Sequence, residues 1–319
     1  MSSDKKIKTT PSVVICAERE KLEGLGEDSY SFSFRSGDNG YIAVYDGCGG
    51  MGARKYSKAK NKTGARIASR LAAYLTDEFY NTQQFKYDGA DHECLKEKFK
   101  EAFNKVKLAV ENDGGFMLGG DLFKAIPTTA SIIAIKPQAE NELLCEFLWA
   151  GDSRGYFLDS DGLCQITKDE LQTEEDAFTN LRSDGRMSNV IYADGEFHIS
   201  ERDITLKSPI MIISSTDGAF GYFSTPMEFE YIILKSLCES ASAEEWERNL
   251  SELIIPVTGD DFAACIAVYG FENYKDIKKY FSKRLDYISR KFIEKIDEDT
   301  PEQELEKLWH KYKTSYYRR

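Results

Sequence analysis

The chain has 319 residues, of which 41% are hydrophobic and 13% aromatic, and this length allows one large domain with an extension, or two domains. Its formal net charge of −12 argues against a nucleic-acid-binding protein, whose surface should be basic overall. The seven cysteines are scattered and include no Cys-x-x-Cys pair, which argues against a disulfide framework and against a zinc ribbon.

Signals for secretion or membrane insertion are weak in this sequence. The N-terminus MSSDKKIKTT lacks the apolar core of a signal peptide. No apolar run approaches the ~20 residues that a membrane helix needs. With unpaired cysteines, these features predict a protein of the reducing cytoplasm that contacts neither membrane nor nucleic acid.

The first part of the chain alternates strand and helix signals. Apolar and aromatic runs at 13–16, 30–34 and 41–45, separated by Gly-rich and Asp-rich turns, predict three strands. Apolar residues at helical spacing then predict helices over 57–80 and 92–112.

A second group of strands and helices follows. Strands are predicted over 128–135, 143–150, 155–158 and 163–167, whereas the polar, acidic segment 168–208 predicts an irregular surface flap. After a strand over 210–214, Thr225 with Glu228 and Ser242 with Glu245 predict the starts of two helices. A strand over 262–269 closes the group.

These elements predict an α+β fold. Short turns between successive strands favour antiparallel sheets, and strands that are apolar on both faces must be covered on both sides. We therefore expect a four-layer α-β-β-α sandwich over residues 1–271. Residues 272–319 read as a C-terminal helical hairpin with a basic stretch. It is either packed on the domain with a solvated basic face or a surface for a protein partner or dimer contact.

Aspartates beside glycines recur at the ends of strands. The strand 41–45 runs into Asp46-Gly47, the strand 210–214 leads to Asp217-Gly218, and Gly259-Asp260-Asp261 precedes the strand 262–269. Buried carboxylates are costly unless something compensates them, and several oxygen ligands together suit hard divalent cations. The pattern predicts a metal enzyme.

Five segments, in chain order, resemble the motifs of the metal-dependent protein phosphatases of the 2C type. Residues 27–29 resemble that family's Glu-Asp element, and Asp46-Gly47-Cys48-Gly49-Gly50 resembles its Asp-Gly-His-Gly-Gly motif. Residues 151–154 are similar to its Gly-Asp-Ser-Arg motif and residues 215–218 to its Ser-Asp-Gly element. Asp260-Asp261 stands where the family has Asp-Asn or Asp-Asp, so the resemblance spans residues 12–271.

The resemblance implies a role for each matching residue. Asp46 would bridge two Mn²⁺ or Mg²⁺ ions, with the Gly47 carbonyl on one ion and with Asp217 and Asp260 on the other. Glu27 and Asp28 would bind through water further out, and Asp152 would help to hold a weaker third ion. From the residues alone, Asp261 instead of Asp260 can be the metal ligand. Glu27, Asp28 and Asp152 can each be plain turn residues.

Two positions depart from the family pattern. Cys48 stands where the family often has a histidine, and it reads as a small packing residue or as a weak proton donor. Glu23 stands where the family places a phosphate-binding arginine. Arg19, Lys21, Arg54 and Lys55 are candidates to replace it, but a flexible lysine does not reproduce a bidentate guanidinium. Arg154 is expected to pair with a carboxylate.

The resemblance implies a phosphoserine/phosphothreonine protein phosphatase in which a metal-activated water attacks phosphorus directly, with Asp46 and Asp217 as catalytic carboxylates. Two alternatives stay open. Glu23 and Cys48 favour a phosphatase-like binding or regulatory module that has lost catalysis. The other alternative is an enzyme that keeps the metals but hydrolyses a small phosphorylated molecule. His92, His198 and His310 lie outside every motif and read as surface or packing residues.

Overall fold

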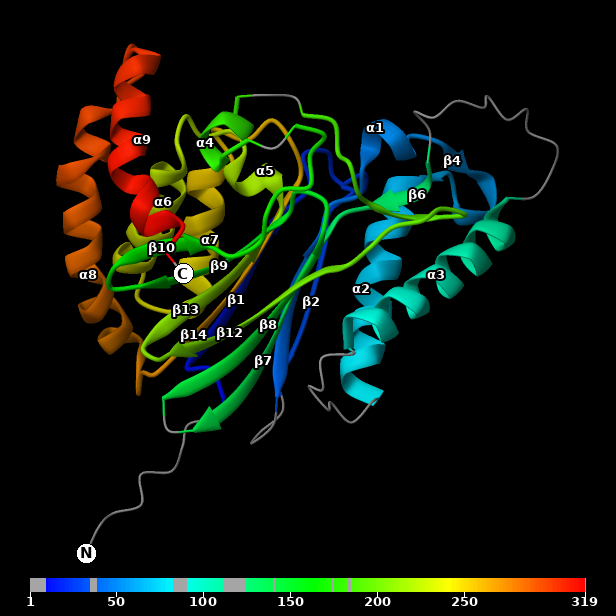
Figure 1. The fold of residues 1–319 in the computed structure, drawn as a ribbon, viewed down its shortest axis with the longest axis horizontal. Coiled ribbons are helices and arrows are strands. Elements are labelled where there is room, and N and C mark those ends of the chain that lie inside the picture. The colour runs from blue at the N-terminus through cyan, green and yellow to red at the C-terminus, as the bar shows by residue number, and fades with distance from the viewer. Residues whose placement is uncertain are drawn as a thin grey trace, which may run out of the picture.

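The computed structural model describes residues 10–34, 39–82, 91–111, 124–139, 141–173, 175–182 and 185–318. They form four layers, which run from left to right in Figure 1: helices, sheet, sheet, helices. The predicted α-β-β-α sandwich is confirmed. The expected end of the second helix near residue 112 and most of the N-terminal segment lie outside the described residues.

Each central sheet has five strands. The first has the order β1 (Val13–Arg19), β14 (Phe262–Tyr269), β13 (Ile210–Ser215), β9 (Arg154–Asp159) and β10 (Gly162–Gln165). The second has the order β12 (Ser200–Lys207), β8 (Glu142–Ala150), β7 (Ala130–Ala139), β3 (Gly40–Tyr45) and β2 (Ser29–Phe34). Every neighbouring pair is antiparallel, as the short connections predict.

Apolar side chains from both sheets fill the space between them. Ile42 and Ile133 of one sheet and Ile212 and Ala267 of the other are fully buried in one apolar cluster. All six residues of β3 are buried, because one face meets this cluster and the other meets the helices. This two-sided burial explains the continuous apolar runs in the sequence.

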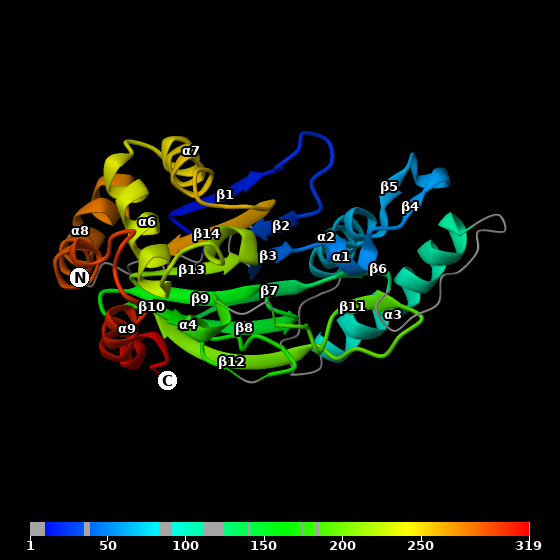
Figure 2. The same ribbon diagram turned by 90° about the horizontal axis from the view of Figure 1, so that it is seen from above.

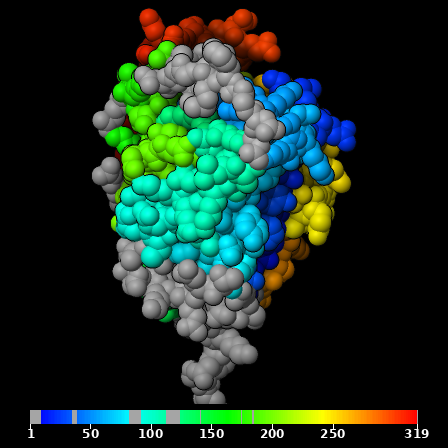
Figure 3. All heavy atoms as spheres, turned by 90° about the vertical axis from the view of Figure 1, so that its right-hand side faces the viewer, coloured from blue at the N-terminus to red at the C-terminus, as the bar shows by residue number. Residues whose placement is uncertain are grey.

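Helices cover both outer faces (Figure 2). Helices α2 (Gly64–Thr82) and α3 (Asp91–Val110) lie over β2, β3 and the small pair β6 (Ala125–Thr128) and β11 (Ile191–Ala193). They form much of the face seen in Figure 3. On the opposite side lie α6 (Pro226–Glu239), α7 (Ala243–Ile254), α8 (Tyr274–Lys291) and α9 (Glu302–Tyr316). Short helices α1 (Gly49–Gly52), α4 (Ala177–Asn180) and α5 (Asp217–Phe220) lie in connecting segments. Among the described residues, no helix combines the length and the apolar character that crossing a bilayer requires.

Two sequence predictions were wrong in detail. The helix predicted from residue 57 begins at Gly64, because Lys60 and Asn61 have φ values of 55° and 59° and break the helical path. Strands β4 (Lys55–Tyr56) and β5 (Lys62–Thr63) and the 3-10 turn η1 (Ser57–Ala59) occupy this stretch. The segment 168–208 is not irregular throughout, since 200–207 form edge strand β12, paired with β8. This strand was not predicted because its sequence is charged and its side chains are partly exposed.

The C-terminal hairpin is packed on the first sheet's helical layer. Phe281, Trp309 and Tyr316 are buried in the same apolar cluster as α6 and α7. A buried ion pair joins Arg284 of α8 to Glu230 of α6, with an Nε–Oε1 distance of 2.5 Å. The 3-10 turn η2 (Ile293–Lys295) follows α8. Division of the chain at residue 271 stays a prediction.

Candidate metal centre

Loops from both sheets meet at one end of the sandwich. Asp46 directly follows β3, Asp152 lies between β8 and β9, and Asp217 begins α5 after β13. In Figure 1 the helices that follow β3 and β13, α1 and α5, lie at this same end. Asp28 and Asp260 are close enough to act electrostatically on Asp46. Segments as far apart in the sequence as Asp28 and Asp260 thus bring five carboxylates together.

The glycines beside these aspartates are required by close packing. A Cβ atom on Gly47 would lie 2.5 Å from the Ala65 carbonyl oxygen of α2. A Cβ atom on Gly218 would lie 1.8 Å from the Asp261 carbonyl oxygen. The Asp-Gly pairs therefore allow the backbone to pass close to neighbouring segments while the aspartate faces the site.

The electrostatics of this cluster is strongly unfavourable for anions. Burial, followed by the charges of Asp28 and Asp217, raises the pKa of Asp46 well above its usual range. Burial and the charge of Asp217 raise the pKa of Asp152 to about 8. Burial and the charge of Asp260 raise the pKa of Asp217, whose carboxyl lies within hydrogen-bonding reach of Asp46. A cation between these groups would remove the repulsion.

The donor atoms suit Mg²⁺ or Mn²⁺. Asp28 Oδ2 and Asp152 Oδ1 are buried and have no hydrogen-bond partner in the described part of the chain. Buried polar atoms normally have partners, so these oxygens leave room for a ligand. Among the described residues, no group of three or more His, Cys, Asp or Glu side chains is arranged so that it could hold a metal ion. The cluster would therefore need waters or a shift of its carboxylates to complete the shell of an ion such as Mg²⁺, which commonly keeps several waters.

Asp260 and Asp261 have different surroundings. The Asp261 carboxylate accepts hydrogen bonds from the backbone N–H groups of Lys21 and Glu27, at 2.6 and 2.7 Å. Asp260 accepts one from the N–H of Asp261 at 2.8 Å, is exposed, and contributes negative charge at Asp217 and Asp46. Both carboxylates contribute negative charge at Asp28, so the choice of Asp260 rather than Asp261 as a ligand stays a prediction.

The loop 20–28 is anchored on α2. Arg66 binds Glu20 at 2.7 Å and the Gly26 carbonyl, and the Ser69 hydroxyl donates to the Glu27 carbonyl. Thr63 donates to the Glu27 carboxylate, and burial raises the pKa of that carboxyl. Glu27 and Asp28 therefore stand in a fixed segment at the margin of the cluster.

Arg154 is paired, as expected. Its Nε and Nη2 atoms bind the two oxygens of Asp169 at 2.8 and 2.6 Å, and both side chains are almost fully buried. Asn180 of α4 donates to Asp169 Oδ2 at 2.7 Å. Arg154 therefore binds the Asp169 carboxylate and is not free to bind a phosphate.

A hollow of about 510 Å³ adjoins the cluster. Asp152 and Asp217 line it together with Arg186 from the flap and Tyr222 after α5. Arg186 is exposed, and no ion pair of its side chain is found among the described residues. Sequence reasoning missed Arg186, because nothing in the polar segment 168–208 distinguishes it from other flap residues.

Of the four cations proposed from the sequence, two are engaged elsewhere. Lys21 Nζ donates to the Gly259 carbonyl. Arg54 pairs with Glu111 at 3.4 Å and lies 5.1 Å from the centre of the Tyr56 ring. Arg19 and Lys55 are exposed at strand ends. Lys124, which no motif predicted, is half-buried beside Cys48 and lies over the ring of Tyr192 at 4.2 Å.

Cys48 is buried, with 5% of its surface exposed, and its thiol lies 3.9 Å from the Asp46 carbonyl. Burial and the neighbouring charge of Asp46 raise its pKa well above the usual value. The thiol is therefore neutral and packs against the turn, which agrees with the packing interpretation.

Solved structures that resemble this chain include bacterial serine/threonine phosphatases. The Mycobacterium tuberculosis phosphatase PstP/Ppp superposes with a TM-score of 0.56 at 18% identity, over 81% of this chain and 99% of that one. Stp1 from Staphylococcus aureus gives 0.58 at 13% identity, over 85% and 100%. This chain has the 2C-type phosphatase fold.

No family model and no curated protein matches the sequence. PppA of Pseudomonas aeruginosa also has the 2C-type fold, with a TM-score of 0.55, 15% identity and coverage of 82% and 99%. The catalytic domain of PstP has been solved with two manganese ions, and it superposes at 0.53 with 17% identity, over 80% and 97%. At such identities the likeness shows the 2C-type fold, and the roles of individual residues stay predictions.

Proposed function

We propose that this protein is a Mn²⁺- or Mg²⁺-dependent phosphatase that hydrolyses phosphoserine and phosphothreonine in proteins. The observation that carries the proposal is the group formed by Asp46, Asp152, Asp217 and Asp28, whose like charges raise one another's pKa values. Their position at the loop end of a 2C-type fold supports the same conclusion.

The donor set supports the following assignment of ligands. Asp46, with the Gly47 carbonyl beside it, would hold the ions together with Asp217 and Asp260. Glu27, Asp28 and Asp152 would act at the margin, Asp152 toward a third ion. Bound ions would lower the pKa of a water and stabilise charge during direct displacement at phosphorus.

The remaining residues would bind and orient the substrate. Arg186 lines the hollow beside Asp152 and Asp217, so its guanidinium is the strongest candidate for contact with the substrate phosphate. Lys124, beside Cys48, is a second candidate. The neutral Cys48 thiol would carry no charge in the reaction. Asp261 would keep the loop 20–28 at the edge of the site.

Hydrolysis of a phosphothreonine peptide with added Mn²⁺ tests the proposal. Asp46→Asn and Asp217→Asn should lower kcat at least about a hundredfold, whereas the exposed Asp286→Asn on α8 should not change it. Circular dichroism would show that the variants fold. If wild type is no faster than Asp46→Asn, the catalytic assignment fails.

The second candidate is a phosphatase-like binding module without catalysis. Glu23, at the family's phosphate-binding position, and the buried neutral Cys48 favour it. Calorimetric titration with Mn²⁺ separates the two: the enzyme should have at least one tight site that Asp46→Asn weakens, whereas a degenerate module should bind Mn²⁺ poorly. A panel of small phosphate esters would identify the remaining alternative, an enzyme that keeps the metals but hydrolyses a small phosphorylated molecule.

A further inference from the structure

The C-terminal helix α9 anchors the short helix α4, which lies beside the candidate metal centre. The carboxylate of Asp176, the N-cap of α4, accepts hydrogen bonds from Trp309 Nε1 at 3.0 Å and from Lys313 Nζ at 2.7 Å. The backbone N–H of Ala177 donates to the Tyr317 hydroxyl at 2.7 Å. A single helical turn is not stable by itself, so α4 depends on these contacts from α9.

A ring pair and an ion pair join the same two helices. The Phe178 ring of α4 stacks on the Trp309 ring, with 6.1 Å between the ring centres and 14° between the planes, and both side chains are buried. Arg182, just after α4, lies 3.7 Å from the centre of the Phe178 ring. Its Nε atom pairs with Oε1 of Glu302, the first residue of α9, at 3.6 Å. Helix α4 is therefore fixed at its start, its middle and its end.

The end of α4 also lines the hollow beside the metal centre. Residues 180–182 share the lining of this hollow with Asp152 and Asp217. Asn180 donates to the Asp169 carboxylate at 2.7 Å, and Asp169 in turn binds Arg154, which also lines the hollow. A continuous series of contacts thus connects α9, through α4, with the edge of the carboxylate cluster.

Arg186, the candidate for contact with phosphate, is fixed by other contacts. Its backbone carbonyl accepts a hydrogen bond from the N–H of Gln172 at 2.8 Å, and Leu171 and Met187 form a β-bridge beside it. These contacts involve neither α4 nor α9. A displacement of α4 would therefore move one wall of the hollow and leave the backbone of Arg186 in place.

We propose that Trp309 and Lys313 are positioning residues, which fix α4 as the wall that the polypeptide of a phosphoprotein substrate contacts. A small phosphate ester needs only the space at the carboxylates, whereas a peptide extends along the hollow of about 510 Å³ and reaches α4. The C-terminal hairpin therefore sets the affinity for phosphoprotein without taking part in the chemistry. This inference rests on the proposed function, because it concerns the substrate of the same site.

The test compares a phosphothreonine peptide with p-nitrophenyl phosphate, using the full-length protein and saturating Mn²⁺. Trp309→Phe keeps a ring against Phe178 but removes the N–H donor, and Lys313→Met keeps the length of the side chain but removes its charge. The double variant should raise KM for the peptide about fivefold, within the range for residues that act through intermediate contacts, and leave kcat unchanged. Both constants for p-nitrophenyl phosphate should stay unchanged, which a general loss of stability would not produce.

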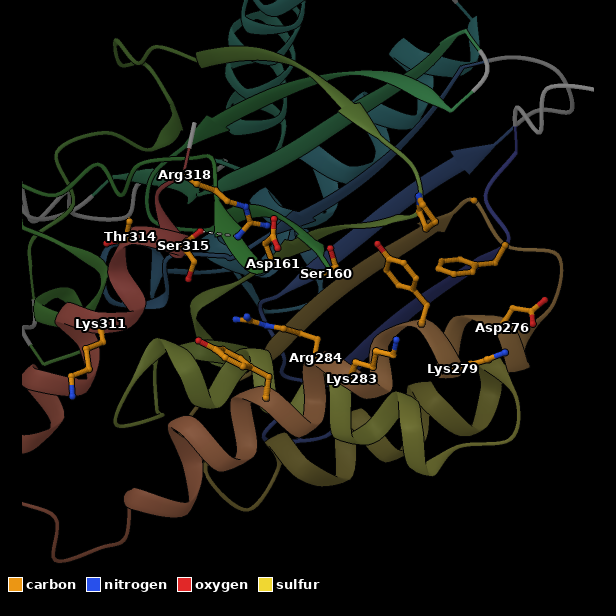
Figure 4. Close-up of a pocket in the computed structure, with 15 residues that line it drawn as sticks. Ser160, Asp161, Asp276, Lys279, Lys283, Arg284, Lys311, Thr314, Ser315 and Arg318 are labelled. Carbon is orange, nitrogen blue, oxygen red and sulfur yellow. Dashed lines mark hydrogen bonds between the residues drawn. The ribbon is translucent and has the colours of Figure 1, made fainter.

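Matched variants separate positioning from stability. Lys311 lies on the opposite face of α9 from Trp309 and Lys313, where it lines the cavity shared with α8 (Figure 4). Lys311→Met should leave KM for the peptide unchanged. Trp246→Phe removes a similar buried N–H donor, which binds Ser236 far along the chain from α4, and should also leave it unchanged.

Amide hydrogen exchange provides a readout that does not need catalysis. Residues 177–180 should exchange faster in the double variant than in wild type or in Lys311→Met. Unchanged exchange in this segment, an unchanged KM for the peptide, or an equal rise in KM for p-nitrophenyl phosphate would overturn the inference.

Failure of the proposed function would look different. A wild type that hydrolyses neither substrate would overturn the proposed function, and fluorescence anisotropy of a labelled phosphothreonine peptide with Mn²⁺ would then test the role of α9. The same rise in Kd in the double variant, and none in Lys311→Met, would support the inference. An unchanged Kd, or no saturable binding of the peptide, would overturn it.

Discussion

Asp261 and Asp260 are neighbours in the chain, but their carboxylates bind different parts of the molecule. Asp261 accepts two backbone N–H groups, from Lys21 and Glu27, and so ties the loop 20–28 to the start of β14. Asp260 is exposed and contributes negative charge at Asp217 and Asp46. One residue is therefore suited to support the site, and the other to bind a cation.

This difference predicts opposite phenotypes. Asp261→Ala should lower the free energy of unfolding by about 1.5–3 kcal/mol, because it removes hydrogen bonds to a charged group. Asp260→Asn should leave metal-free stability within about 0.5 kcal/mol of wild type and weaken Mn²⁺ binding. Urea denaturation and calorimetry would measure the two effects. If Asp261→Ala weakens Mn²⁺ binding more than Asp260→Asn does, the two roles are exchanged.

The buried pair of Arg154 and Asp169 predicts a large stability effect. Asp169→Asn leaves a buried guanidinium without its counter-charge, and breaking such a pair costs about 3–5 kcal/mol. Glu196→Gln is the matched control, because it breaks the exposed pair with Lys100, and solvent-exposed pairs contribute little to stability. Similar small losses in both variants would show that the buried pair is not held as described.

Asp176 predicts a pH dependence. Burial raises the pKa of this carboxyl, but hydrogen bonds from Lys313 and Trp309 outweigh burial and lower it to about 2. Because the folded pKa lies below the ordinary value of about 3.9, the stabilisation is complete above that pH and is lost as the pH falls toward 2.

Asp176→Asn isolates this effect, because asparagine is also a good N-cap for α4. The stability difference between wild type and this variant should be constant from pH 7 to 5 and should shrink below pH 4. Thermal unfolding by circular dichroism across this range would measure it. A difference that stays constant down to pH 2 would contradict the assigned interaction.

Gly218 predicts a steric effect next to the metal centre. A Cβ atom there would lie 1.8 Å from the Asp261 carbonyl oxygen, so Gly218→Ala should destabilise the fold by about 1–3 kcal/mol. The control is Gly50→Ala, since nothing lies within 4 Å of a Cβ atom on Gly50. Equal melting temperatures for the two variants would contradict the close approach.

Much of the fold was predictable because its signals are local. Apolar runs predicted the strands β3, β13 and β14, and the capping box of Thr225 and Glu228 predicted the start of α6. The start of α2 was missed because the left-handed turn at Lys60 and Asn61 has no glycine to signal it. The strand β12 was missed because an edge strand with solvent on one side can be rich in charge.

The aspartates of the site were also predictable, since each stands beside a glycine at a strand end. Their partners were not. Asp169 is 15 residues from Arg154, and Asp261 reaches Lys21 across 240 residues. Arg186 and Lys124 come near the cluster only in the tertiary structure. Such contacts depend on tertiary structure and leave no spacing pattern.

The most direct measurement of the central claim is phosphate release from a phosphothreonine peptide by protein stripped with EDTA and then supplied with Mn²⁺. We predict no turnover without the metal, recovery on its addition, and no recovery in Asp46→Asn. Turnover that persists without metal, or a wild type that stays inactive with saturating Mn²⁺ while remaining folded, would contradict a metal-dependent phosphatase.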